Sequence, residues 1–95
     1  MLAVELVKQL GLKDYTFDAN KNLTVSIESS DLWDKIKNKL HKMEDFDEIE
    51  DKSIVEDAKC TSVFESDDLL VELVLSFTDD NHTITIKEIE NGDNN

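Results

Sequence analysis

The chain has 95 residues and a formal net charge of −13; 39% of its residues are apolar and 35% are charged. This length supports one domain, and this apolar content is sufficient for a packed core. The chain has no arginine, no proline and only two glycines, which excludes Gly-rich phosphate-binding loops and, with the excess of negative charge, direct binding to nucleic acid.

The first residues predict a short helix. Leu2, Leu6 and Leu10 recur every four residues, as on one face of a helix. Gly11 then supplies the left-handed residue that commonly ends a helix. We therefore expect the helix to stop at Gly11.

A β-hairpin is predicted for residues 14–28. Apolar and polar side chains alternate on both sides of a polar turn at residues 19–22. Tyr15 and Phe17 lie on the first strand and are expected to face inward, because aromatic side chains suit a half-buried sheet surface.

A second helix is predicted to follow the hairpin. Ser29 offers a side-chain oxygen that can cap its first turn. The apolar side chains that recur at helical spacing are Leu32, Ile36, Leu40 and Met43.

Three lysines of this helix share another face, because Lys35, Lys39 and Lys42 are separated by four and three residues. Two interpretations stay open. The lysines form a solvated face, or they form a docking stripe for an acidic surface, including the carboxylates that follow in the same chain.

The charge changes sign after this helix. Residues 1–43 hold seven lysines and six acidic residues, for a net +1, whereas residues 44–95 hold three lysines and seventeen acidic residues, for −14. Residues 44–57, EDFDEIEDKSIVED, alone carry eight carboxylates and one lysine. Such a large excess of negative charge influences solubility and the choice of binding partners, but it does not indicate the fold.

Residues 44–57 are expected to leave the helix, because carboxylates are unfavourable at the negative end of a helix dipole. Asp45 and Glu48, three residues apart, favour a short new helical turn. In that turn Phe46 and Ile49 would face inward and hold the carboxylates outward.

Three strands are predicted in the rest of the chain. Residues 54–64 alternate, residues 69–78 carry an apolar side chain at every odd position up to Phe77, and residues 82–90 form the last strand. The predicted fold is α+β, with a five-stranded, mainly antiparallel sheet, two helices on one face and the element order α-β-β-α-β-β-β. Residues 1–90 would form a single domain and residues 91–95 a frayed C-terminal tail.

Two apolar features fit both a structural and a binding role. Leu70 and Val74 lie on the face of the third predicted strand that the helices leave open, and are either exposed sheet or a modest interface for a dimer or a partner. Trp33 lies beside the apolar stripe of the second helix and is either part of the core or an interface anchor.

Catalytic and metal sites are not indicated. Asp45, Asp47, Ser53 and Glu56 have EF-hand spacing, but Glu50 stands where that loop requires glycine. Asp79, Asp80 and His82 are typical turn residues rather than metal ligands. No catalytic grouping surrounds the single Cys60. We therefore expect a protein without a cofactor or enzymatic activity.

The remaining function is binding, and the acidic residues indicate the kind of partner. Rows of carboxylates can occupy a basic groove that otherwise holds the phosphates of DNA. The candidate partner-binding residues are Glu44, Asp45, Asp47, Glu48, Glu50, Asp51, Glu56, Asp57, Glu65, Asp67, Asp68, Asp79 and Asp80, with Phe46 and Ile49 as apolar anchors. The expected partner is a basic, nucleic-acid-binding protein.

In its size, α/β composition and acid-dense segments such as EDFDEIED, the chain resembles small phage-encoded inhibitors of host defence nucleases, including anti-CRISPR proteins that mimic DNA. The resemblance implies a stoichiometric inhibitor of an RNA-guided Cas nuclease. Immunity proteins that neutralise nuclease toxins are similar in the same respects. A structural module that self-associates is the third hypothesis.

Location and assembly follow from the same sequence. No apolar run is long enough to span a bilayer, and residues 1–10 lack the features of a signal peptide. We therefore expect no membrane association and a cytoplasmic protein, in the host cell if the chain is phage-encoded. A monomer or a weak homodimer is expected.

Overall fold

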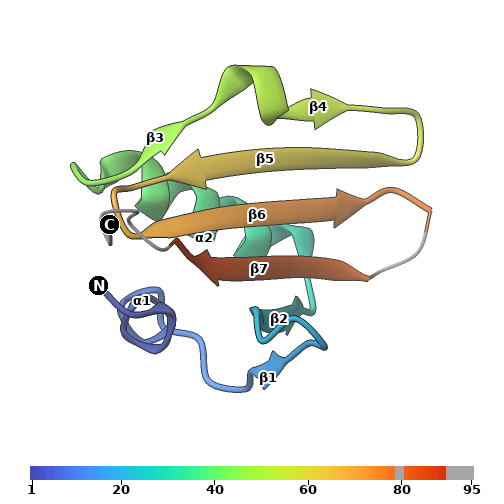
Figure 1. Ribbon diagram of the computed structural model, residues 1–95. Helices are drawn as coiled ribbons and strands as arrows, with labels where there is room; N and C mark the ends of the chain where they lie inside the picture. The colour runs from blue at the N-terminus through green and yellow to red at the C-terminus, as the bar shows by residue number, and fades with distance from the viewer. Residues whose placement is uncertain (79–80, 90–95) are drawn as a thin grey trace.

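An antiparallel sheet lies at the centre of the computed structural model, which describes residues 1–78 and 81–89 (Figure 1). In this described part the chain forms two α-helices, one 3₁₀ turn and seven strands. They are α1 (Ala3–Gln9), β1 (Thr16–Phe17), β2 (Leu23–Ile27), α2 (Ser30–Lys42), β3 (Asp47–Glu48), η1 (Glu50–Lys52), β4 (Ile54–Val55), β5 (Lys59–Glu65), β6 (Leu69–Ser76) and β7 (His82–Glu88). The sheet order is β1-β2-β7-β6-β5-β3, and β4 also pairs with β5.

The α+β class is as predicted, but the five-stranded sheet and the element order are wrong. The two additional strands, β3 and β4, both come from residues 44–57. Each has only two residues, which is too short to produce a recognisable alternation. Both pair with β5, so a partner later in the chain decides their conformation.

The helical turn expected at Asp45 and Glu48 is also replaced by strand β3. The predicted strand over residues 54–64 is in fact two strands, because the chain reverses direction between β4 and β5. At this reversal the Glu56 N–H donates to the Lys59 carbonyl oxygen at 2.8 Å. The alternating pattern of residues 54–64 therefore corresponds to a hairpin of two antiparallel strands.

Helix α1 ends as the sequence predicts. Gly11 has φ of 77°, and its N–H donates to the Lys8 carbonyl oxygen at 3.1 Å, while the Leu12 N–H donates to the Val7 carbonyl oxygen at 3.0 Å. These two bonds form a Schellman motif. The motif turns the chain out of α1 and toward the hairpin.

The β1–β2 hairpin is confirmed, with Thr16 opposite Thr24. The expected burial of its aromatic residues is wrong, because 38% of Tyr15 and 57% of Phe17 are exposed. The two rings instead contact each other edge to face, with centroids 5.7 Å apart. Strand β1 is the outermost strand on its side of the sheet, which leaves these rings at the surface.

The second helix begins where predicted, since Ser29 Oγ accepts a hydrogen bond from the Leu32 N–H at 3.1 Å. Its buried residues are Trp33, Ile36 and Leu40. Leu32, expected in the apolar stripe, is 38% exposed, and the core holds Trp33 in its place.

One face of the sheet and both helices share a single core. Val71 lies opposite Ile86, and Ile86 lies opposite Leu23, so that neighbouring strands align their buried side chains. The buried residues of α1 and α2 join these residues in one cluster, and Figure 1 shows α2 behind β5, β6 and β7. On the other face, Leu70 and Val74 are half-buried.

Candidate partner-binding surface

The segment of residues 44–57, here called the acidic edge, forms the border of the sheet along β5 (Figure 1). Its backbone is fixed by β5. The Ile49 N–H donates to the Val63 carbonyl oxygen at 2.8 Å, and Ser53 Oγ accepts from the Val63 N–H at 3.1 Å and donates to the Ile49 carbonyl oxygen at 3.0 Å. The carboxylates of the acidic edge are therefore displayed from an ordered backbone.

One of the two predicted anchors reaches the core. Phe46 is 5% exposed and belongs to the core cluster. Ile49 is half-buried and lies outside that cluster. Two sets of contacts therefore hold the acidic edge: the side chain of Phe46 packs in the core, and the backbone of the segment is hydrogen-bonded to β5.

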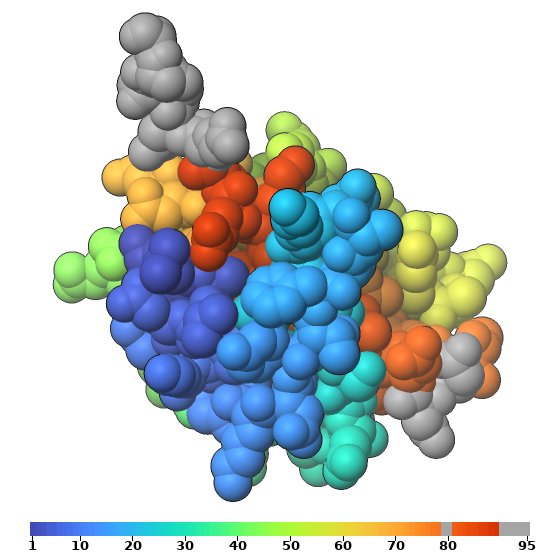
Figure 2. Space-filling model, turned by 60° about the horizontal axis from the view of Figure 1, so that its bottom comes forward, coloured from blue at the N-terminus to red at the C-terminus, as the bar shows by residue number. Residues whose placement is uncertain are grey.

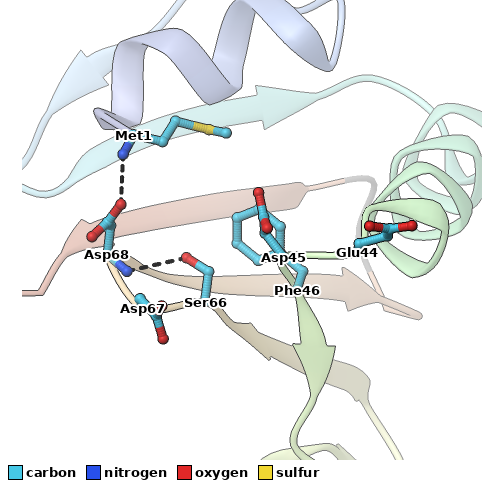
Figure 3. A pocket seen from close by; sticks show the side chains of 7 residues that line it. All are labelled: Met1, Glu44, Asp45, Phe46, Ser66, Asp67 and Asp68. Atoms are coloured by element: carbon cyan, nitrogen blue, oxygen red, sulfur yellow. Dashed lines mark hydrogen bonds and ion pairs between the residues drawn. The ribbon is translucent and has the colours of Figure 1, made fainter.

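A cleft of about 400 Å³ opens where the acidic edge meets the turn between β5 and β6. We call it the acidic cleft, and it is lined by Met1, Glu44, Asp45, Phe46, Ser66, Asp67 and Asp68 (Figure 3). The sequence placed these carboxylates in separate rows, 20 or more residues apart. The fold brings them around one hollow.

The N-terminal ammonium group supplies a positive charge in the acidic cleft. Met1 N donates to Asp68 Oδ2 at 2.6 Å (Figure 3). This hydrogen bond raises the pKa of the amino group above its ordinary value of 8.0, and the charges of Asp68, Glu5 and Glu88 act in the same direction. The turn beneath is held by Ser66 Oγ, which accepts from the Asp68 N–H at 3.3 Å and the Leu69 N–H at 3.1 Å.

Two further carboxylates meet across the strands. Asp47 of β3 lies directly opposite Glu65 of β5, and both side chains are exposed. Like charges at directly opposed positions destabilise a sheet. Within residues 1–78 and 81–89, neither of these two carboxylates forms an ion pair.

The lysines of α2 do not compensate these acids through ion pairs. The Lys39 ammonium group donates to the Leu10 carbonyl oxygen at 3.4 Å, and the Lys37 ammonium group lies 5.6 Å from the centre of the Trp33 ring. Within residues 1–78 and 81–89, the side-chain contact that links α2 to a carboxylate of the acidic edge is that of His41 Nε2 with Glu48 Oε1, at 3.2 Å, and it is an ion pair only when the imidazole is protonated.

The remaining candidates are not gathered in the acidic cleft. Glu56 and Asp57 are exposed at the turn between β4 and β5, at the opposite end of β5 from Asp67 and Asp68. Asp79 and Asp80 lie outside the described residues. The fold therefore divides the predicted surface between the two ends of β5.

Met1 and Ser66 belong to the site but were missed in the sequence. The signal for Ser66 was available, because Ser-Asp-Asp before an apolar run is typical of a turn closed by a serine oxygen. Nothing in the sequence placed Met1 beside Asp68, since 67 residues separate them.

Other kinds of site are not indicated in the described part of the chain. Its His, Cys, Asp and Glu side chains form no group of three that could hold a metal ion. Among the described helices, none has the length and apolar character needed to cross a membrane.

Comparison of the chain with protein-family models, with curated proteins and with solved structures finds no match in any of the three.

Proposed function

We propose that this protein is a non-catalytic, acidic inhibitor that binds the basic nucleic-acid-binding surface of a partner protein. One observation carries the proposal: eleven carboxylates line β5 and its two ends, and within the described residues nine of them form no ion pair, while Asp68 pairs with the N-terminal ammonium group and Glu48 contacts the His41 imidazole. The eleven are Glu44, Asp45, Asp47, Glu48, Glu50, Asp51, Glu56, Asp57, Glu65, Asp67 and Asp68. Such a surface attracts a basic groove and repels nucleic acid.

The density of this charge supports mimicry of a phosphate backbone. The eight residue steps from Asp57 to Glu65 span about 26 Å at the rise of a β-strand. About 26 Å of B-DNA carries roughly 15 phosphate charges. Eleven carboxylates over a comparable length give a similar linear charge density, reduced by Lys52 and Lys59.

The ordered backbone of the acidic edge supports tight binding. The segment is held in place without a partner by Phe46 in the core, by the Ile49 N–H, which donates to β5, and by Ser53 Oγ, which accepts a hydrogen bond from β5. Preorganised groups lose less conformational entropy on binding than flexible ones. The long-range field would also accelerate association with a basic protein at low salt.

The narrower proposal, that the partner is a Cas nuclease, rests on the class resemblance in size and acid-dense segments. A nuclease toxin neutralised by an immunity protein has the same basic groove and is the alternative. Both partners expose a surface that normally contacts DNA. The same experiment addresses both.

The test is displacement of labelled DNA from purified nucleases, both RNA-guided nucleases and nuclease toxins. The test variant carries Asp45→Asn, Asp47→Asn, Glu48→Gln and Glu50→Gln. The control variant changes the charge equally but elsewhere, with Asp14→Asn, Glu28→Gln, Asp31→Asn and Asp34→Asn. We expect the test variant to bind roughly tenfold to hundredfold more weakly than the control, with a shallower salt dependence.

Equal displacement of DNA by the two variants would reject the acidic edge as the binding surface. Circular dichroism of both variants shows whether the fold is retained. Sedimentation of the protein alone addresses self-association: a monomer at low and high salt counts against a structural module, whereas a dimer that forms regardless of salt favours one.

A further inference from the structure

Strand β4, within the acidic edge, exposes two large apolar side chains at the border of the sheet. Ile54 is 50% exposed and Val55 is 77% exposed. No lysine or proline stands between residues 53 and 58, although natural proteins commonly use both to protect an edge strand. This border is therefore open to another strand.

Among the described residues, none forms a hydrogen bond with the outer side of the Val55 backbone. The Glu56 N–H donates to the Lys59 carbonyl oxygen, so Glu56 and Lys59 form a hydrogen-bonded pair. Ile54 and Thr61 lie two positions further along the same ladder and are therefore also a hydrogen-bonded pair. In an antiparallel ladder, hydrogen-bonded and non-hydrogen-bonded pairs alternate. Val55, opposite Cys60, thus directs its N–H and C=O away from β5, where a further strand would meet them.

Val55 is the last residue of a row of neighbouring residues that crosses the sheet from β2 to β4. The solvent exposure of the side chains increases along this row toward Val55. Ile27 and His82 are 2% and 6% exposed, whereas Leu75 and Cys60 are half-buried. The register places these residues side by side, because Cys60 lies opposite Leu75 and Ile27 lies opposite His82. An added strand would extend this row and cover Val55.

The opposite border of the sheet is geometrically similar but differs in charge. There β1 also has two residues, and 57% of Phe17 is exposed. Figure 2 shows the segment that contains β1 at the surface, next to the N-terminal segment that contains α1. Residues 13–21 hold two lysines and two aspartates, for a net charge of zero, whereas residues 44–57 carry −7. The charge distinguishes β4 from β1 as a docking site.

We propose that β4 binds an extended segment of the basic partner by strand addition, with apolar residues at the centre of that segment and lysine or arginine at its ends. The central residues cover Ile54 and Val55, the backbone pairs with Val55, and the basic ends meet Glu50 and Asp51 on one side and Glu56 and Asp57 on the other. This inference rests on the proposed function. A second copy of the chain is disfavoured as the occupant, because two molecules of charge −13 would bring their acidic edges together.

The probe is a labelled peptide, Lys-Lys-Thr-Val-Ile-Thr-Lys-Lys, whose binding is measured by fluorescence anisotropy at low ionic strength. Val55→Pro removes the outward N–H without removing a hydrogen bond to β5, and proline is accepted at such edge positions. The matched control is Phe17→Pro on the opposite border, where Phe17 holds the equivalent outward position. We expect Val55→Pro to weaken peptide binding about tenfold and Phe17→Pro to leave it unchanged.

A second measurement does not depend on the folding of either variant. The same peptide with N-methyl groups on its four central amides keeps its charge but cannot pair with an edge strand, and we expect it to bind the unaltered protein at least tenfold more weakly. Equal binding of the methylated peptide, or unchanged binding by a folded Val55→Pro variant, would overturn strand addition and indicate attraction by charge alone. A dimer of the unaltered protein that Val55→Pro dissociates would likewise overturn it, in favour of a second copy. None of these outcomes contradicts the proposed function, which is tested separately by the DNA-displacement assay.

Discussion

Asp47 lies directly opposite Glu65 in the ladder between β3 and β5, so two carboxylates on neighbouring strands share one side of the sheet. The pair works against the pairing that holds the acidic edge in place. Stability and the proposed partner binding therefore make opposite demands on these two positions, and the effect on stability can be measured.

Neutralising one member of this pair should stabilise the protein. We expect Asp47→Asn to raise the free energy of unfolding by about 0.5 kcal/mol relative to Asp51→Asn, because removal of the repulsion is worth a few tenths to 1 kcal/mol at opposed positions. Asp51→Asn is the matched control, since it removes the same charge from η1, where Asp51 faces no strand partner. Urea denaturation of both variants checks the prediction. Equal stability would mean that solvent screens the pair completely.

The ion pair between Met1 and Asp68 should make stability depend on pH in the alkaline range. The pKa of the amino group is raised in the folded state above 8.0, so the contribution to stability is complete below pH 8 and is lost as the pH rises through the folded-state pKa. The unaltered protein should lose more stability than Asp68→Asn between pH 7 and 10, measured by urea denaturation at each pH. Asp67→Asn, one position earlier in the same turn, should behave like the unaltered protein, and an identical pH profile in all three proteins would contradict the role of this ion pair.

Phe46 should account for most of the side-chain anchoring of the acidic edge. Phe46→Ala is expected to lower the free energy of unfolding by about 3–4 kcal/mol, because it leaves a cavity in the core. Ile49→Ala, at a half-buried position outside the core cluster, should cost clearly less, about 1–2 kcal/mol. Chemical denaturation compares the two variants. The reverse order would show that Ile49 is the principal anchor.

Two positions with positive φ should respond in opposite directions. Gly11→Ala should destabilise the protein by about 1–2 kcal/mol, because φ is 77° there and the nearest atom to an added Cβ, Lys39 Nζ at 3.8 Å, leaves sufficient space. Lys21 has φ of 65°, so Lys21→Gly should be neutral or stabilising by up to about 1 kcal/mol. Thermal or urea unfolding measures both variants. A large loss of stability in Lys21→Gly would show that its side chain, rather than its backbone, determines the turn.

Some elements could be predicted because their signals are local. The Ser29 cap and the spacing of Ile36 and Leu40 are contained in one stretch of chain, and they located α2. Gly11 likewise marked the end of α1. The excess of negative charge after position 43 could also be predicted, because it follows from a count of acidic and basic residues in the sequence.

Other features depended on residues that are distant in the sequence. Phe46 and Val55 are both apolar residues among carboxylates, yet their exposed fractions are 5% and 77%. Phe46 joins the shared core of the two helices, whereas Val55 ends a sheet row whose residues become less covered toward β4. No local pattern distinguishes the two.

The sequence by itself determined the helices, the central strands and the sign and quantity of the charge. Only the tertiary structure decided how the carboxylates are arranged: β3 and β4 exist because β5 is available to pair with them, and the acidic cleft exists because Met1 and Asp68 meet across 67 residues. The physical reason is that a two-residue strand or a surface cleft has no periodicity of its own. Its stability comes from contacts that form only once the sheet has closed.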